Sequence, residues 1–285
     1  IGNEYQPGAL IFFLAISPIL WLQKSITTYQ LGLFIVNVWL IIVLAILYKS
    51  YGNFKNVILL SLILLLTGPI VLFRFDLYVM TIVIFSIYLW KKNLQTLAIV
   101  FLCYASFVKI FPVIFLTYYL ILAYKNQGLK QTVKILLVYL VSYFVFLGIF
   151  SVATGMKPSQ IMASFGFIAN TPVHTESLWG TLTTLIWMVT TGEFAKGAGS
   201  WGIFGIASEF QIGPLWFYNY FWIIPVGLFY LWIFYRMKKN EAKFDVSVCL
   251  LVTLLFLLFS KILHHQYTLW FMLLIPLLDV KLLLF

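Results

Sequence analysis

The stretch LAIVFLCYASFVKIFPVIFLTYYLILA, residues 97–123, holds a single charged residue, Lys109, among its 27 positions. One membrane crossing takes about 20 apolar residues, so the stretch is too long for one crossing and too short for two. Basic loops flank both of its ends. Pro112 interrupts a helix because it lacks a backbone N–H. We therefore expect a re-entrant or two-short-helix hairpin that turns around Lys109 and Pro112.

The whole chain shares this apolar character. Of its 285 residues, 63% are hydrophobic and 9% are charged, and the mean hydropathy is +1.04. Soluble domains carry about 25% charged residues. We predict an all-α polytopic membrane protein, with one integral-membrane domain over residues 1–285 and about 8–10 transmembrane or half-inserted helices. The apolar segments lie at 8–22, 31–48, 57–73, 77–90, 97–123, 135–153, 177–190, 214–235, 244–260 and 262–280.

Positive charge is concentrated in four short loops, which hold 11 of the 18 basic residues. The loops lie at 49–55, 91–92, 125–134 and 236–243. Cytoplasmic loops of membrane proteins carry an excess of Lys and Arg, so we assign all four to the cytoplasm. The net charge of +10 is then explained by topology and by contact with anionic lipid, and nothing indicates nucleic-acid binding. Residues 154–213 become an outer region, in which 177–190 is expected to be a half-inserted helix.

This topology places a set of ionisable residues on the outer side of the membrane. They come from four separate parts of the sequence: Arg74, Asp76, Lys109, Glu176, Lys261, His264 and His265. Charged groups at membrane depth are costly and mark functional sites, so their convergence predicts a polar cavity that opens outward. Interfacial anchoring, in which Lys side chains snorkel toward water, stays open for each residue alone.

The last apolar segment carries part of this set at its mouth. Lys261, His264 and His265 stand at i, i+3 and i+4, which share one face of a helix. Gln266 and Tyr267 continue the polar collar, and we expect it to line a substrate pocket. The alternative is that Tyr, Trp and Lys only anchor the helix at the interface.

Several chemistries are disfavoured by the sequence. There is no G-x-S-x-G, P-loop, G-x-G-x-x-G or D-x-D motif, and the eight acidic residues and adjacent histidines form no metal-ligand pattern. Both cysteines lie inside apolar runs, as buried small residues do. We therefore expect no metal and no cofactor. Cations at a bilayer surface suit an anionic lipid headgroup, above all a phosphate.

Four stretches also resemble the GT-C superfamily of membrane glycosyltransferases. EYQPGALIFFLAISP (residues 4–18) resembles a Tyr-Pro-Pro motif. GPIVLFRFDLYVMTIVIFSIYLWKK (68–92), followed by AIVFLCYASFVKIFPVIFL (98–116), resembles an Arg-x-Asp turn and a later Lys-Ile/Leu-Tyr-Pro helix break. HTESLWGTL (174–182) is similar to a Gln-x-Glu-Ser-Leu stretch of the polyprenol-phosphate-mannose-dependent mannosyltransferase-like family. SKILHHQYTLWFMLLIPLL (260–278) resembles the Lys-x-x-x-Ser-Gln-Tyr-x-x-Trp segment of the first mannosyltransferase of GPI-anchor synthesis.

The chain departs from the family pattern at its start. The resemblance implies a catalytic aspartate in a first outer loop that precedes the Tyr-Pro-Pro motif. Here the motif reads Tyr5-Gln6-Pro7, and only Glu4 lies nearby. We expect that this chain lacks the first helix and the first outer loop, and that the main catalytic base lies upstream of it.

The resemblance implies an inverting hexosyltransferase, with mannose as the expected sugar. The donor is a polyprenyl-phosphate sugar, and the acceptor is a lipid, glycan or protein outside the cell membrane. Arg74, Lys109, Lys261 and His264 would hold the donor phosphate, and Asp76 and Glu176 would orient hydroxyl groups. A transporter or flippase with an outward cavity is the alternative, although such proteins are usually built on internal repeats, and we find none. A non-catalytic scaffold would not need these ionisable groups on one side.

Overall fold

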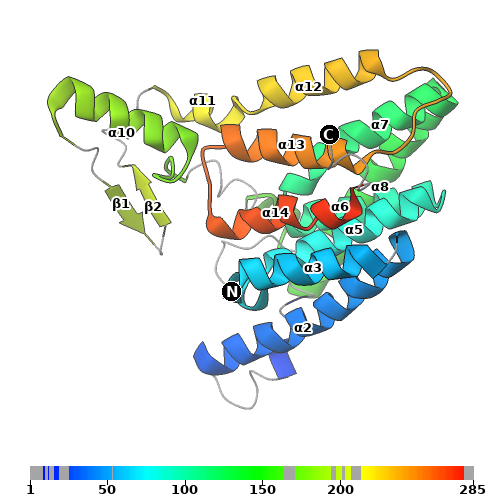
Figure 1. The fold of residues 1–285 in the computed structure, drawn as a ribbon, viewed down its shortest axis with the longest axis horizontal. Helices are drawn as coiled ribbons and strands as arrows, with labels where there is room; N and C mark the ends of the chain where they lie inside the picture. Colours follow the sequence, from blue (N-terminus) through cyan, green and yellow to red (C-terminus); the bar gives the residue numbers. More distant parts are fainter. Residues whose placement is uncertain are drawn as a thin grey trace.

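The computed structural model describes residues 26–52, 54–163, 171–193, 197–200, 203–206 and 213–278, together with Ala9, Phe12 and residues 16–18. Helices make up most of this part of the chain (Figure 1). In chain order they are α2 Ile26–Tyr51, α3 Phe54–Thr67, α4 Pro69–Phe73, α5 Asp76–Lys91, α6 Gln95–Val108, α7 Ile114–Gln127, α8 Leu129–Thr154, α10 Leu178–Thr191, α11 Leu215–Tyr220, α12 Ile223–Arg236, α13 Val246–Phe259 and α14 Thr268–Met272. The described part of the chain also forms 3-10 turns at Phe111–Val113, His265–Tyr267 and Ile275–Leu277.

Helix α5 lies at the centre of the bundle and is buried along most of its length. It packs against α2, α6 and α14. Between Asp76 and the terminal Lys91 it carries no charged residue, as expected for a helix enclosed by other helices. Segment 77–90 is confirmed as a helix, whereas segment 57–73 is divided at Gly68 into α3 and α4, and α4 meets α5 at a turn around Arg74 and Phe75.

The outer helices carry apolar side chains on their outward faces. Leu66 of α3, Val141 and Val152 of α8, and Leu228 of α12 are all exposed. Among the described residues, three helical segments are long and apolar enough to cross a membrane: Thr27–Tyr51, Leu129–Thr154 and Leu215–Arg236. An apolar surface of this kind suits lipid rather than water, so these features indicate a membrane protein. The finer expectation of eight to ten crossing or half-inserted helices stays a prediction.

The predicted hairpin over residues 97–123 is confirmed. Helix α6 ends at Val108, and the backbone N–H of Lys109 closes it by donating to the carbonyl of Ala105 at 2.9 Å. Lys109 itself has extended backbone angles, and Pro112 begins the return through a 3-10 turn into α7. The hairpin consists of the two short helices α6 and α7, as the length of the segment and its proline predict.

The region after α8 includes the predicted helix as α10, and its place outside the membrane stays a prediction. The described chain is predominantly helical, consistent with the all-α expectation, and strands β1 (Gly197–Ser200) and β2 (Ile203–Ile206) add one short antiparallel hairpin. Figure 1 shows α10 and this hairpin set apart from the main bundle. The insertion depth of α10 stays a prediction. Parts of the region lie outside the described residues, as do Glu4, the Tyr5-Gln6-Pro7 stretch, most of segment 8–22 and the end of segment 262–280.

The prediction of one helix over 262–280 is wrong. Helix α13 ends at Phe259, residues 260–264 are not helical, and only Thr268–Met272 returns to α-helix between two 3-10 turns. The cause is a long-range contact, because the carbonyl of Lys261 accepts a hydrogen bond from the backbone N–H of His174 at 2.9 Å. Lys261, His264 and His265 therefore do not share a helical face.

The four basic loops meet at one end of the bundle, on the right in Figure 1. The Lys91 ammonium lies 3.6 Å from the centre of the Tyr51 ring, which joins the first two loops. Gln131 of the third loop donates to Gln95, just after the second loop, at 2.9 Å. Asn126 of the third loop donates to the carbonyl of Ala242 in the fourth loop at 2.7 Å. Loops that belong to one side of a membrane must lie together in this way.

We predict that this basic end faces the cytoplasm. Lys130 and Lys157 are exposed residues near the opposite ends of α8, so they form a matched pair for cysteine replacement. In intact cells an impermeant maleimide should label Lys157→Cys, and it should label Lys130→Cys only after permeabilisation. The two native cysteines, Cys103 and Cys249, are buried and give little background. Labelling of Lys130→Cys alone in intact cells would contradict the assigned orientation.

Candidate functional site

The turn between α4 and α5 presents Asp76 to the interior of the bundle. Buried Asn37 of α2 holds this turn by donating from its side-chain amide to the carbonyls of Leu72, at 2.8 Å, and Arg74, at 3.1 Å. Asp76 then begins α5 with its side chain only 2% exposed. A carboxylate at the N-terminus of a helix is favoured by the helix dipole. Arg74 itself is exposed at the end of α4.

Asp76 forms an ion pair with Lys109 across 33 residues of sequence. The Lys109 ammonium donates to Oδ1 of Asp76 at 2.6 Å, and the Trp270 indole N–H donates to the same oxygen at 2.6 Å. The Lys109 side chain is 17% exposed. A buried carboxylate is costly unless it is paired and hydrogen-bonded, and both conditions are met here.

Aromatic rings enclose the Lys109 ammonium. It lies 4.6 Å from the centre of the Tyr267 ring and 4.8 Å from that of Trp270, distances at which a cation is attracted to a ring face. Trp270 is in turn stacked on Phe111, with centroids 3.7 Å apart, and on Tyr267, at 4.2 Å. The helix break at 109–113 and the turn at 265–267 therefore hold each other through one aromatic stack.

Lys261 reaches the same region from the end of α13. It is 3% exposed, and its ammonium donates to the carbonyl of Thr171 at 2.6 Å. Burial lowers the pKa of Lys261 to about 8, because the charged form loses hydration. Lys261 therefore carries its charge at pH 7 and loses it at a lower pH than an exposed lysine does.

Three histidines occupy the rim. His174 is buried, its ring contacts that of His264 at 4.5 Å, and its Nδ1 lies 3.4 Å from the carbonyl of Leu263. Burial is the main cause that lowers the pKa of His174 to about 4, and burial also lowers the pKa of His264. Both rings are neutral at pH 7, so at this pH His264 can offer a hydrogen bond to an anion but not a full charge. His265 and Glu176 are exposed and only 3.9 Å apart, which makes a weak pair.

The loop that carries His174 and Glu176 is fixed by the start of α10. The Ser177 hydroxyl donates to the carbonyl of His174 at 2.7 Å and accepts from the N–H of Gly180 at 3.1 Å, which caps the helix. A Cβ at Gly180 would lie 2.0 Å from the His174 carbonyl oxygen, so this tight turn needs glycine. The sequence alone did not predict the capping role of Ser177 or the need for glycine at Gly180.

A cavity of about 310 Å³ opens between these elements. Lys109, Lys261, Tyr267 and Trp270 line it together with Phe256 and residues of the α7 and α11–α12 segments. No carboxylate belongs to its described lining; Asp76 contacts Lys109 but does not line the cavity. Asp76 offsets one of the two lysine charges, so the cavity wall stays positive at pH 7. This wall suits a small anion or an anionic headgroup.

The structure thus brings together most of the residues predicted from the sequence. Lys109 contacts both Asp76 and Tyr267, Lys261 lines the same cavity as Lys109 and Tyr267, and His264 contacts Tyr267 with ring centres 5.7 Å apart. Glu176 and His265 stand at the exposed rim, and Gln266 is half-buried in the turn before Tyr267. Arg74 is not among the described residues that line the cavity, and its field reaches His264 from outside.

Sequence reasoning missed Trp270 and Phe111 as parts of the site. A signal for each was present, since Trp270 follows Tyr267 by three residues, about one helical turn, and Phe111 lies in the Lys109–Pro112 break. Two aromatic residues beside predicted cation positions are candidates for a cation–π enclosure.

Comparison with protein-family models finds no match for this chain. Comparisons with curated proteins and with solved structures find none either.

We predict that Asp76 and Lys109 stabilise the fold only as a pair. Asp76→Asn leaves a half-buried ammonium without its carboxylate, and Lys109→Gln leaves a buried carboxylate without its cation, so each should cost about 1–3 kcal/mol of unfolding free energy. The double variant should cost less than the sum of the two, which a double-mutant cycle in detergent measures. The exposed pair Glu176→Gln and His265→Asn is the control and should show little coupling. Additive effects at Asp76 and Lys109 would show that the ion pair is not a coupled unit.

Proposed function

We propose that the protein is an inverting glycosyltransferase of the membrane that transfers a hexose, mannose in the first instance, from a polyprenyl-phosphate sugar. The acceptor is a lipid, glycan or protein at the outer face of the cell membrane. The observation that carries the proposal is the placement of Lys109 and Lys261, distant in sequence, in the wall of one cavity without a carboxylate in its described lining. The motif resemblance points to the same donor class.

The cavity wall suits the leaving group of this reaction. When the bond between the anomeric carbon and the phosphate oxygen breaks, negative charge grows on the phosphate, and cations placed beforehand stabilise that charge. Lys261 would meet the phosphate, and Lys109 would stand on its other side, held in place by Asp76 and the Tyr267–Trp270 stack. His264 would donate a hydrogen bond, and Arg74 would add a longer-range field from the surface.

The acidic residues take different parts in this proposal. Asp76 is a positioning residue, because Lys109 and Trp270 both donate to its Oδ1. Glu176 is exposed at the rim beside His265, where it can orient a hydroxyl of the acceptor or the sugar. Gln266 and Tyr267 would contact the sugar from the turn at 265–267. The acceptor hydroxyl attacks the anomeric carbon on the face opposite the phosphate, so the configuration inverts. We place the main catalytic base outside this set.

We predict that Lys261 supplies charge to donor binding. In the complete protein, Lys261→Gln keeps a donor for the Thr171 carbonyl but removes the charge, so the affinity for a radiolabelled polyprenyl-phosphate mannose should fall about tenfold or more. The wild-type affinity should also fall as pH rises through about 8, where Lys261 loses its proton, and this pH dependence should be absent in Lys261→Gln. The donor phosphodiester itself does not titrate in this range.

Lys130→Gln, which removes a lysine charge at the opposite end of the bundle, is the matched control and should bind like the wild type. Sugar transfer to acceptors in native membranes should fall with donor affinity in Lys261→Gln. Unchanged affinity and an unchanged pH profile in Lys261→Gln would reject the phosphate role. Donor binding by the wild type without transfer to any acceptor would favour the transporter alternative.

A further inference from the structure

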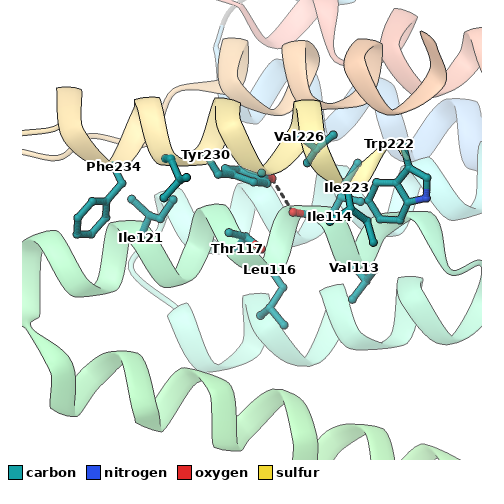
Figure 2. Close-up of a pocket in the computed structure, with 12 residues that line it drawn as sticks. Val113, Ile114, Leu116, Thr117, Ile121, Trp222, Ile223, Val226, Tyr230 and Phe234 are labelled. Carbon is teal, nitrogen blue, oxygen red and sulfur yellow. Dashed lines mark hydrogen bonds between the residues drawn. The ribbon is translucent and has the colours of Figure 1, made fainter. Parts of the chain in front are cut away.

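A long apolar groove runs between α7 and α12. It encloses about 660 Å³, and the described residues that line it include no charged side chain. Figure 2 shows its two walls, with Val113, Thr117 and Ile121 on α7 and the segment leading into it, and Val226 and Phe234 on α12. The groove follows the helices for much of their length, so its shape suits an extended object rather than a compact one.

The groove adjoins the cationic cavity. Val113, Ile114, Trp222 and Ile223 line both spaces, so one end of the groove lies beside the cavity that holds Lys109 and Lys261. At the other end the Lys125 ammonium lies 4.1 Å from the centre of the Phe234 ring, which places that end beside the basic loops. A positive pocket and an apolar track therefore lie next to each other in the bundle.

The two walls are held at a fixed separation. The Tyr230 hydroxyl donates to the carbonyl of Ile114 at 2.5 Å and ties α12 to the start of α7 (Figure 2). The small residues Thr117 and Gly227 in the lining keep the space between the walls open. A Cβ built at Gly227 would meet no atom within 4 Å. One helix forms each wall, so the groove is a single track rather than a broad surface.

We propose that this groove holds the hydrocarbon chain of a single-chain anionic lipid, whose phosphate lies in the Lys109–Lys261 cavity. The assignment of the phosphate end rests on the proposed function, whereas the track itself rests on the groove. Charge complementarity selects this occupant: an apolar helix of a protein partner would fill the track but leave the positive pocket without an anion. A two-chain phospholipid would leave its second chain outside the walls.

The test fills the groove from within. Gly227→Leu should weaken binding of undecaprenyl phosphate about tenfold, because the new side chain takes the place of buried methylene groups. Binding of isopentenyl phosphate, whose chain is too short to follow the groove, should be unchanged. Gly148→Leu is the matched control, because Gly148 lies on an exposed face of α8 and its Cβ would also meet no atom within 4 Å. Binding is measured on the complete protein in detergent, and Thr117→Leu on the opposite wall serves as a second blocking variant.

Unchanged binding of undecaprenyl phosphate in both blocking variants would overturn the assignment, as would an equal loss for the short and the long lipid. Equal binding of a two-chain phosphatidylglycerol by the wild type would overturn the single-chain claim. Failure of the wild type to bind the long lipid would also overturn the assignment. The proposed function is separable, because a protein that binds the long lipid through the groove but transfers no sugar keeps this inference and loses that one.

Discussion

The Asp76–Lys109 ion pair is the constraint on which the rest of the site depends. A helical bundle with an apolar exterior can bury a charge only if it supplies the partner and the hydrogen bonds that water would have given. Here the partner comes from the start of α5, and the aromatic enclosure comes from Tyr267 and Trp270 after α13. Three segments far apart in sequence must therefore meet at one point. The helix ends around that point follow from this requirement.

The two ends of the bundle differ in their backbone structure. At one end the loops are short, basic and joined by polar contacts such as Gln131 to Gln95. At the other end the backbone leaves the helical form at the α4–α5 turn, at Lys109 and at residues 260–264, and the cavity opens among these breaks. Irregular backbone at membrane depth is tolerated where it is buried in protein or lines a cavity. The site therefore lies where the described backbone departs from regular helix, and the groove beside it runs between the regular helices α7 and α12.

Local signals in the sequence predicted the parts of this fold that depend on neighbouring residues. Pro112 and Lys109 predict the break between α6 and α7 because a missing N–H and a charge both interrupt an apolar helix. The prediction of a helix over 262–280 was wrong, because neither Gly nor Pro stands near Lys261 to indicate the break in the sequence. The backbone there is extended by a hydrogen bond from His174, which no local pattern can reveal. The convergence of Asp76, Lys109 and Lys261 was inferred from topology, but their partners came only from the structure.

We propose that a lipid phosphate binds in the Lys109–Lys261 cavity and that its chain lies in the adjoining groove between α7 and α12. An electron cryomicroscopy structure of the complete protein in nanodiscs, with undecaprenyl phosphate added, tests both assignments at once. We expect density for a phosphate within hydrogen-bond distance of the Lys261 ammonium, continued by a single chain along Gly227 toward Phe234. Density for the added lipid elsewhere on the bundle, or a protein helix occupying the groove, would contradict it.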